Sequence, residues 1–217
     1  MKKLVLLFTA LLSVAVLSSC SDDDSDNNNN NNTTTASVIT VANLRSYVGQ
    51  SNSQISSSIT SKGYVLTSSE VQENGAKTYA YTSSTSGAAC SIMEYNNIIF
   101  GAYYTLVGTD QSSQLSLFKT LSNEAYSIYT SIVHDYASTI LTTEPQEFTS
   151  HQNFISAINS STGILTCMEA FNVLDQDGEL TSMTQLMYLS SNIASKGFGS
   201  VTVSYTDYTI PSPLDIK

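Results

Sequence analysis

Apolar residues recur every three or four positions in the first part of the chain that can fold, and this spacing predicts two short helices. The first runs over 41–48, and Thr40 can cap it with its side-chain hydroxyl. The second is expected after Ser51, because Ser51 and Gln54 have the spacing of a capping box. Gly63 can take the left-handed conformation that ends a helix, so this helix should end there.

The next part of the chain is rich in β-branched and aromatic residues and reads as four strands. The expected strands are 64–71, 77–83, 89–95 and 98–107. Asn74-Gly75 separates the first two, and both residues tolerate the positive φ of a tight hairpin turn. Asn96-Asn97 separates the last two in the same way. The pattern predicts a four-stranded antiparallel meander.

Helices and strands are mixed in the second half of the sequence. The longest helix is expected from Ser112 or Ser113 to Tyr136, followed by a connecting loop over 137–149. The remaining expected elements are a helix from Ser150, a strand over 164–174, a helix from Ser182 to Gly197 and a strand over 201–210. Together the elements predict an α+β fold, in which an antiparallel sheet made of the meander and C-terminal strands packs against helices.

Two short segments resemble each other. Residues 59–64 read Ile-Thr-Ser-Lys-Gly-Tyr, and residues 193–198 read Ile-Ala-Ser-Lys-Gly-Phe. Each is expected where a capped helix passes into a strand. The likeness indicates either a duplicated helix-strand unit or only the Lys and Gly that helix ends favour in general.

The first 20 residues have the pattern of an export signal. Lys2 and Lys3 precede an apolar run over 4–16, which is too short to span a bilayer. Small residues follow it, directly before Cys20. This order predicts a signal peptide over 1–19 and a lipid anchor on the thiol of Cys20; the alternative is ordinary secretion with an incidental cysteine.

The segment Leu17-Ser18-Ser19-Cys20 resembles the lipobox of bacterial lipoproteins. The residues after it, Ser21, Asp22, Asp23 and Asp24, resemble the acidic export signal of Bacteroidetes-type surface lipoproteins. The resemblance implies an outer-membrane lipoprotein that is lipid-anchored and exposed at the cell surface. The same acidic residues would also suit a solvated leader to a linker, so a domain that faces the periplasm is the alternative.

The composition of residues 20–37 predicts a flexible tether. Six Asn and three Thr fill positions 27–35, with no apolar side chain to offset the backbone entropy of ordering them. Residues 38–217 are a normal length for one globular domain. We therefore expect a signal peptide, a tether and a single α+β domain.

The net charge is strongly negative. The whole chain has 8 basic and 18 acidic residues. Since the signal peptide contains Lys2 and Lys3 and no acid, the mature chain has 6 basic residues and a net charge of −12. Four of the acids lie before residue 27, which leaves −8 on the globular part. Nucleic acid and anionic lipid are therefore poor partners.

Motifs that carry catalysis or bind a cofactor are absent from the sequence. It contains no G-x-S-x-G, H-E-x-x-H or C-x-x-C, and no phosphate-binding glycine loop. His134 and His151 could form a nucleophilic pair with a cysteine only if the fold brings them together. Otherwise His134 suits the negative end of the long helix. We expect no enzyme activity and no cofactor.

Residues 175–179 read Asp-Gln-Asp-Gly-Glu and have the oxygen density of a calcium loop. Thr184 stands where a bidentate Glu would close an EF-hand, so an ordinary Asp-Gly turn is expected and no metal site. Weak calcium binding at the surface is the alternative.

Cys90 and Cys167 are the remaining cysteines after Cys20. Both are expected on strands of a protein outside the cytosol, where a disulfide is chemically permitted. Free cysteine is also a common buried apolar residue, and the sequence favours neither state.

The chain has 13 Tyr and no Trp. Five of the tyrosines fall on the expected meander: Tyr79, Tyr81, Tyr95, Tyr103 and Tyr104. If they share one solvent-exposed face, they form a platform for a glycan or a protein ligand. Tyrosines on strands are more often core residues or cross-strand pairs.

The sequence thus favours a non-catalytic surface lipoprotein that acts as a binding or adhesion module. Two alternatives stay open: a periplasm-facing accessory or inhibitor protein of the outer membrane, and a small hydrolase with an unrecognised site.

Overall fold

The computed structural model describes residues 36–132, 134–141, 144–161, 165–193 and 196–213. The signal peptide, Cys20, the acidic residues after it and most of the tether lie outside the described residues. Four helices are described: α1 (Val41–Tyr47), α2 (Asn52–Thr60), α3 (Gln111–Tyr129) and α4 (His151–Ser160). The described strands are β1 (Val65–Val71), β2 (Lys77–Thr82), β3 (Ala88–Tyr95), β4 (Ile98–Gly108), β5 (Asp135–Leu141), β6 (Gln146–Phe148), β7 (Thr166–Leu174), β8 (Leu180–Ile193) and β9 (Lys196–Asp207).

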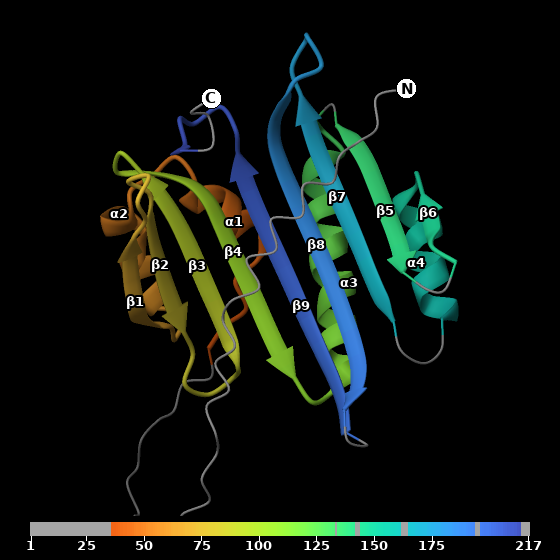
Figure 1. Cartoon of the computed structure of the whole chain (residues 1–217). Coiled ribbons are helices and arrows are strands. Elements are labelled where there is room, and N and C mark those ends of the chain that lie inside the picture. Colours follow the sequence, from red (N-terminus) through yellow and green to blue (C-terminus); the bar gives the residue numbers. More distant parts are fainter. Residues whose placement is uncertain (1–35, 133, 142–143, 162–164, 194–195, 214–217) are drawn as a thin grey trace, which may run out of the picture. The chain divides into compact units, whose positions relative to one another are not determined.

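The nine described strands form one antiparallel sheet in the order β1-β2-β3-β4-β9-β8-β7-β5-β6. The helices lie on one side of it (Figure 1). The chain therefore has the α+β fold expected from its sequence, with an antiparallel sheet packed against helices. The N-terminal meander joins the second half through the pairing of β4 with β9, the last strand.

Local sequence signals account for the first half. The Thr40 hydroxyl accepts a hydrogen bond from the Asn43 amide at 3.3 Å and caps α1. Asn96 and Asn97 have φ of 50° and 65°, as a two-residue hairpin turn between β3 and β4 requires. Gly75 has φ of 84° in the turn between β1 and β2. The expected meander and the Asn96-Asn97 turn are confirmed. In the first hairpin only Gly75 of the expected Asn-Gly pair has positive φ, and the amide of Gln72 closes the loop on the carbonyl oxygen of Ala76 at 2.7 Å.

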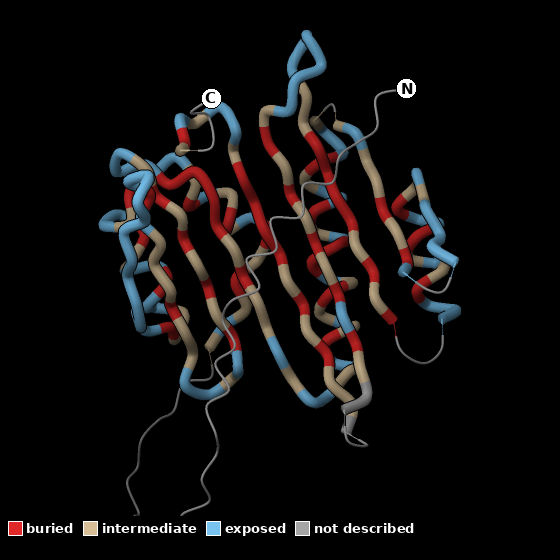
Figure 2. Tube along the Cα trace, in the orientation of Figure 1, coloured by how far each residue is buried: buried red, intermediate tan, exposed pale blue. Residues whose placement is uncertain are grey.

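The core fills the space between the sheet and the helices. Buried and half-buried residues alternate along β3, because successive side chains point to opposite faces (Figure 2). Helix α3 crosses β9 and β8, and its Phe118 is fully buried against Phe154 and Tyr188, with ring centroids 6.3 and 6.1 Å away. This packing covers one face of the sheet only.

The expected boundary of the long helix is wrong. Helix α3 ends at Tyr129, and Tyr136 lies in β5. The expected loop over 137–149 contains part of β5 and all of β6. Tyr136 lies seven residues after Tyr129, so its position fits the apolar stripe of a continued helix. It fits the start of an alternating strand equally well. Pairing of β5 with β7 decides between the two.

The expected helix from Ser182 to Gly197 is also wrong, because this part of the chain contains β8 and the start of β9. Large apolar side chains lie on both faces of β8, so adjacent residues such as Leu186 and Met187 also fit the apolar stripe of a helix. Pairing with β7 and β9 overrides the local pattern. Among the described residues of the segment 193–198, Ile193 ends β8 and residues 196–198 begin β9, so these residues provide no support for a duplicated helix-strand unit.

Candidate functional site

The five tyrosines expected to form a platform are divided between the two faces of the sheet. Tyr79, Tyr81 and Tyr104 point toward the helices, and Tyr81 and Tyr104 are each 1% exposed. The Tyr81 hydroxyl donates to Asn52 Oδ1 at 2.7 Å. The Tyr79 hydroxyl donates to Glu94 Oε1 at 3.2 Å. These three side chains are part of the core side, so the five-tyrosine platform is wrong.

Tyr95 and Tyr103 lie on the other face, which no described helix covers. We call this surface the open face. Its members on the central strands include Met93, Tyr95, Tyr103, Thr105, Ser200, Thr202, Ser204, Thr206, Met183, Gln185, Met187, Thr166, Met168 and Ala170. Thr105 Oγ1 and Thr202 Oγ1 lie 3.3 Å apart across β4 and β9. Burial raises the pKa of Tyr103, while a hydrogen bond with Thr206 lowers it by a smaller amount.

All four methionines after Met1 lie on the open face. Met93 is on β3, Met168 on β7, and Met183 and Met187 are on β8; each is half-buried. Gly101 makes room beside the first of them, since a Cβ at Gly101 would lie 3.0 Å from Met93 Cε. Methionine adapts its shape to a neighbour and is favoured on surfaces that bind other molecules. This grouping depends on strand register and strand order, so the linear sequence contains no signal for it.

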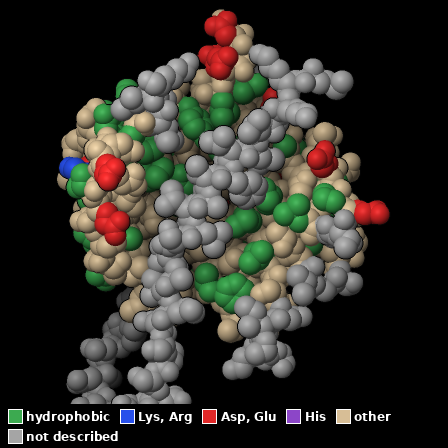
Figure 3. All heavy atoms as spheres, viewed as in Figure 1, with side chains coloured by type: hydrophobic (Ala, Val, Ile, Leu, Met, Phe, Trp, Pro, Cys, Tyr) green, Lys and Arg blue, Asp and Glu red, His purple; other side chains and the backbone are tan. Residues whose placement is uncertain are grey.

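Charge is absent from the middle of the open face. Among its described side chains none is Lys or Arg, and the acidic ones, Glu70, Asp135 and Glu147, stand on the outer strands β1, β5 and β6. Where the face is visible in Figure 3, hydrophobic side chains gather over the central strands and acidic ones lie toward the margin. The face is apolar and hydroxyl-rich with an acidic margin.

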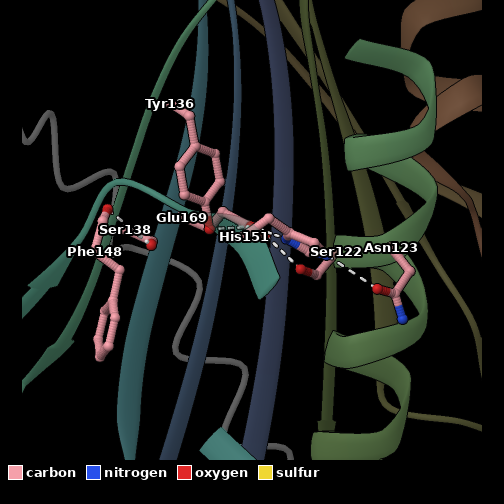
Figure 4. A network of polar contacts seen from close by, with 7 residues as sticks. All are labelled: Ser122, Asn123, Tyr136, Ser138, Phe148, His151 and Glu169. Atoms are coloured by element: carbon pink, nitrogen blue, oxygen red, sulfur yellow. Dashed lines mark hydrogen bonds and ion pairs between the residues drawn. The ribbon is translucent and has the colours of Figure 1, made fainter. Parts of the chain in front are cut away.

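A polar cluster lies on the helix side, around the buried carboxylate of Glu169 (Figure 4). Glu169 is 2% exposed. Its Oε2 accepts a hydrogen bond from the Ser122 hydroxyl at 2.6 Å. Its Oε1 accepts from the Tyr136 hydroxyl at 2.9 Å and pairs with His151 Nδ1 at 2.8 Å. Burial, together with the nearby carboxylate of Glu169, raises the pKa of Tyr136 far above its usual value.

The second ring nitrogen of His151 is also occupied. Nε2 lies 3.0 Å from Asn123 Oδ1. Both ring nitrogens of His151 therefore have a polar partner, and Nδ1 is directed at the carboxylate of Glu169. The ring also stacks on Tyr126, with centroids 4.4 Å apart and planes at 10°. His151 is therefore fixed by contacts to α3 and β7.

This cluster does not have the arrangement of a catalytic triad. Ser122 is fully buried and donates to Glu169, and no hydrogen bond joins Ser122 to His151 among the described contacts. A hydrolytic nucleophile needs a base within hydrogen-bond reach. The other histidine, His134, follows the end of α3 and packs on Tyr129 and Phe171, so its expected place in the last helical turn is wrong.

A shallow hollow of about 340 Å³ opens beside the cluster. It is lined by Asn123, Tyr126, His151, Gln152, Ile155 and Ser156. Helices α3 and α4 supply all six residues. Sequence reasoning named His151 among these residues but missed the carboxylate that holds it, although a Glu inside the apolar segment 164–174 was an available signal of a buried polar contact.

Cys90 and Cys167 are free and buried, which corrects the disulfide that the sequence permitted. They lie on β3 and β7, with β4, β9 and β8 between them. Four strand spacings separate them by roughly 19 Å, whereas a disulfide needs Cα atoms within about 7 Å. Burial raises the pKa of the Cys90 thiol to about 12. Neither thiol pairs with a histidine in the described contacts.

The acidic segment 175–179 forms the turn between β7 and β8. Asp175 Oδ1 accepts hydrogen bonds from the amides of Asp177 and Glu179, each at 2.9 Å, and Gly178 has φ of 79°. No group of three His, Cys, Asp or Glu in the described residues could hold a metal ion. Among the described helices, none is long and apolar enough to cross a membrane.

Comparison of the chain with protein-family models, with curated proteins and with solved structures found no match.

Proposed function

We propose that this protein is a non-catalytic binding or adhesion module of the cell surface, and that its open face binds a protein partner. The observation that carries the proposal is the placement of Met93, Met168, Met183 and Met187 on the one face of the sheet that no described helix covers. Met168 and Met187 pair directly across β7 and β8, and Met183 lies on the same face of β8. Apolar side chains grouped on an uncovered face of a folded domain are typical of an interaction site.

The side chains of this face favour a protein over a glycan. Stacking on sugar rings needs flat aromatic side chains, and only Tyr95 and Tyr103 of the five expected tyrosines point this way. Methionine side chains instead pack against irregular apolar surfaces. The acidic margin around an uncharged centre favours a partner with an apolar patch flanked by Lys or Arg.

The N-terminal sequence supports a location at the outer membrane. The lipobox-like segment ending at Cys20 would anchor the chain by lipid, and the acidic residues Asp22, Asp23 and Asp24 resemble a surface-export signal. A tether of about 17 residues has a root-mean-square reach of roughly 20 to 25 Å, which would let the domain stand clear of the lipid headgroups.

Cross-linking on intact cells tests the proposal. The test variant is Met183→Gln/Met187→Gln, on the central strand β8. The matched control is Leu66→Gln/Val71→Gln, which makes the same kind of change at exposed positions of the edge strand β1. We expect one cell-surface protein to cross-link to the wild type and to the control but not to the test variant. Once purified, this partner should bind the wild type and the control with similar affinity and the test variant more weakly.

Two results would contradict the proposal. Equal cross-linking and equal affinity for all three proteins would show that the open face takes no part. Retention of a polysaccharide by the open face, with no protein partner, would show that the ligand class is wrong. Thermal unfolding of each variant separates lost binding from lost folding.

A further inference from the structure

The hollow beside His151 has a flat aromatic wall. Tyr126 is 42% exposed, and its ring lies on the ring of His151 at 4.4 Å. His151 itself is 7% exposed and is held through Nδ1 by Glu169 and through Nε2 by Asn123. A ring supported from behind in this way loses little further freedom when a ligand packs on it.

Hydrogen-bonding groups around this wall are available to a ligand. Among the described contacts, the side-chain amide of Gln152 has no partner, and Asn123 uses only its Oδ1. The Ser156 hydroxyl donates to the backbone carbonyl oxygen of Gln152 at 2.8 Å and can still accept a hydrogen bond from a ligand. The hollow therefore offers both donors and acceptors beside an apolar ring face.

The lining of the hollow is uncharged apart from His151. None of the lining residues is Asp, Glu, Lys or Arg, and Nδ1 of His151 is directed at the buried carboxylate of Glu169. A ligand with a formal charge would therefore find no carboxylate, ammonium or guanidinium group among the lining residues. A volume of about 340 Å³ is near the lower end of small-molecule sites, so it suits a small ring rather than a long chain.

We propose that this hollow binds one sugar residue of a neutral glycan. The apolar face of the sugar ring packs on Tyr126, and its hydroxyl groups hydrogen-bond to Asn123, Gln152 and Ser156. Neutral sugars combine a flat patch of C–H groups with a rim of hydroxyls, which is the complement of this wall and its polar neighbours. The site lies on the helix side of the sheet and is independent of the open face.

Binding of neutral oligosaccharides to the full-length lipidated protein in detergent tests this proposal. Saturation-transfer NMR with oligosaccharides of glucose, mannose, galactose and xylose would identify a ligand, and calorimetry would give its Kd. We expect Tyr126→Ala and Tyr126→Leu each to raise the Kd at least tenfold, and Gln152→Ala to raise it severalfold. Tyr208→Ala is the matched control, because Tyr208 is 37% exposed elsewhere on the surface.

The proposal is overturned if no neutral oligosaccharide binds at millimolar concentration, or if only uronic-acid oligosaccharides bind. It is also overturned if both Tyr126 variants keep the wild-type Kd. Met183→Gln/Met187→Gln changes the open face only and should bind the sugar as the wild type does. A result that contradicts protein binding at the open face therefore leaves sugar binding in the hollow unaffected, and the reverse also holds.

Discussion

Replacing Glu169 by Gln should destabilise the protein more than any comparable change on its surface. Glu169 is 2% exposed, and its two oxygens accept from Ser122, Tyr136 and His151. Hydrogen bonds to a charged group contribute roughly 1.5 to 3 kcal/mol each. The amide of Gln replaces one acceptor oxygen by a donor, so at least one of the three hydrogen bonds is lost and a buried polar group is left without its partner.

The expected loss of unfolding free energy is about 3 kcal/mol, because a buried charged acceptor of three hydrogen bonds is removed. For a domain of this size the loss corresponds to a fall in Tm of roughly 6 to 12 °C. Urea unfolding followed by circular dichroism measures the free energy, and a thermal scan measures the Tm.

Glu124→Gln is the matched control on α3. Glu124 is half-buried and accepts from the amides of Val41 and Ala42 at 3.2 and 3.1 Å, so its loss should cost about 1 kcal/mol. A double-mutant cycle with His151→Gln should give a coupling energy of about 2 kcal/mol with Glu169→Gln. A Glu169→Gln loss no larger than that of Glu124→Gln, or zero coupling, would refute the paired state of His151 and Glu169.

Four further measurements test other parts of the structure. Hydrogen bonds from Ser113 and Ser112 lower the pKa of Asp110 to about 2. The ionised carboxylate therefore supports the N-terminus of α3 fully above the ordinary pKa of Asp, and this support is lost as the pH falls through about 2. NMR titration of Asp110 should show a midpoint near this value, and Ser112→Ala/Ser113→Ala should raise the midpoint. Because burial raises the pKa of Cys90 to about 12 and also raises that of Cys167, neither thiol should react with a disulfide reagent in the folded protein, and both should react in guanidinium without a reductant. Fast reaction in the native state would contradict their burial. Phe118→Ala should cost about 3 to 5 kcal/mol of unfolding free energy, and a cost below 1 kcal/mol would mean that α3 does not pack as described. Replacing Asp22, Asp23 and Asp24 by Ala should protect the domain from protease on intact cells but not in lysates, and unchanged cleavage would reject the export signal.

Local signals predicted the first half of the fold because its contacts are mostly sequential. Asn96-Asn97 and Asn74-Gly75 each join strands that pair with each other, and Thr40 and Ser51 cap the helices that follow them. The second half depends on pairing between distant segments. Strand β8 lies between β7 and β9, and both of its faces are partly apolar, so its sequence alone fits a helix as well as a strand.

The candidate sites were less predictable than the fold for a related reason. Whether Tyr103 and Tyr104 face solvent or core depends on strand register, which a shift of one residue reverses. The grouping of methionines from β3, β7 and β8 depends on the order of strands in the sheet. His151 and Glu169 are 18 residues apart and meet only because α4 packs on β5 and β6, beside β7, which carries Glu169.

A comparison of the two buried carboxylates on the helix side indicates what His151 adds. Glu94 accepts directly from the backbone amide of Asn52, the first residue of α2, at 2.7 Å. Glu169 instead meets the imidazole of His151, the first residue of α4. A carboxylate on the sheet can therefore hold the start of a short helix without an imidazole. The ring of His151 extends the polar network to the surface and supports the exposed ring of Tyr126. Docking of the helix does not require this support, whereas a ligand site in the hollow does.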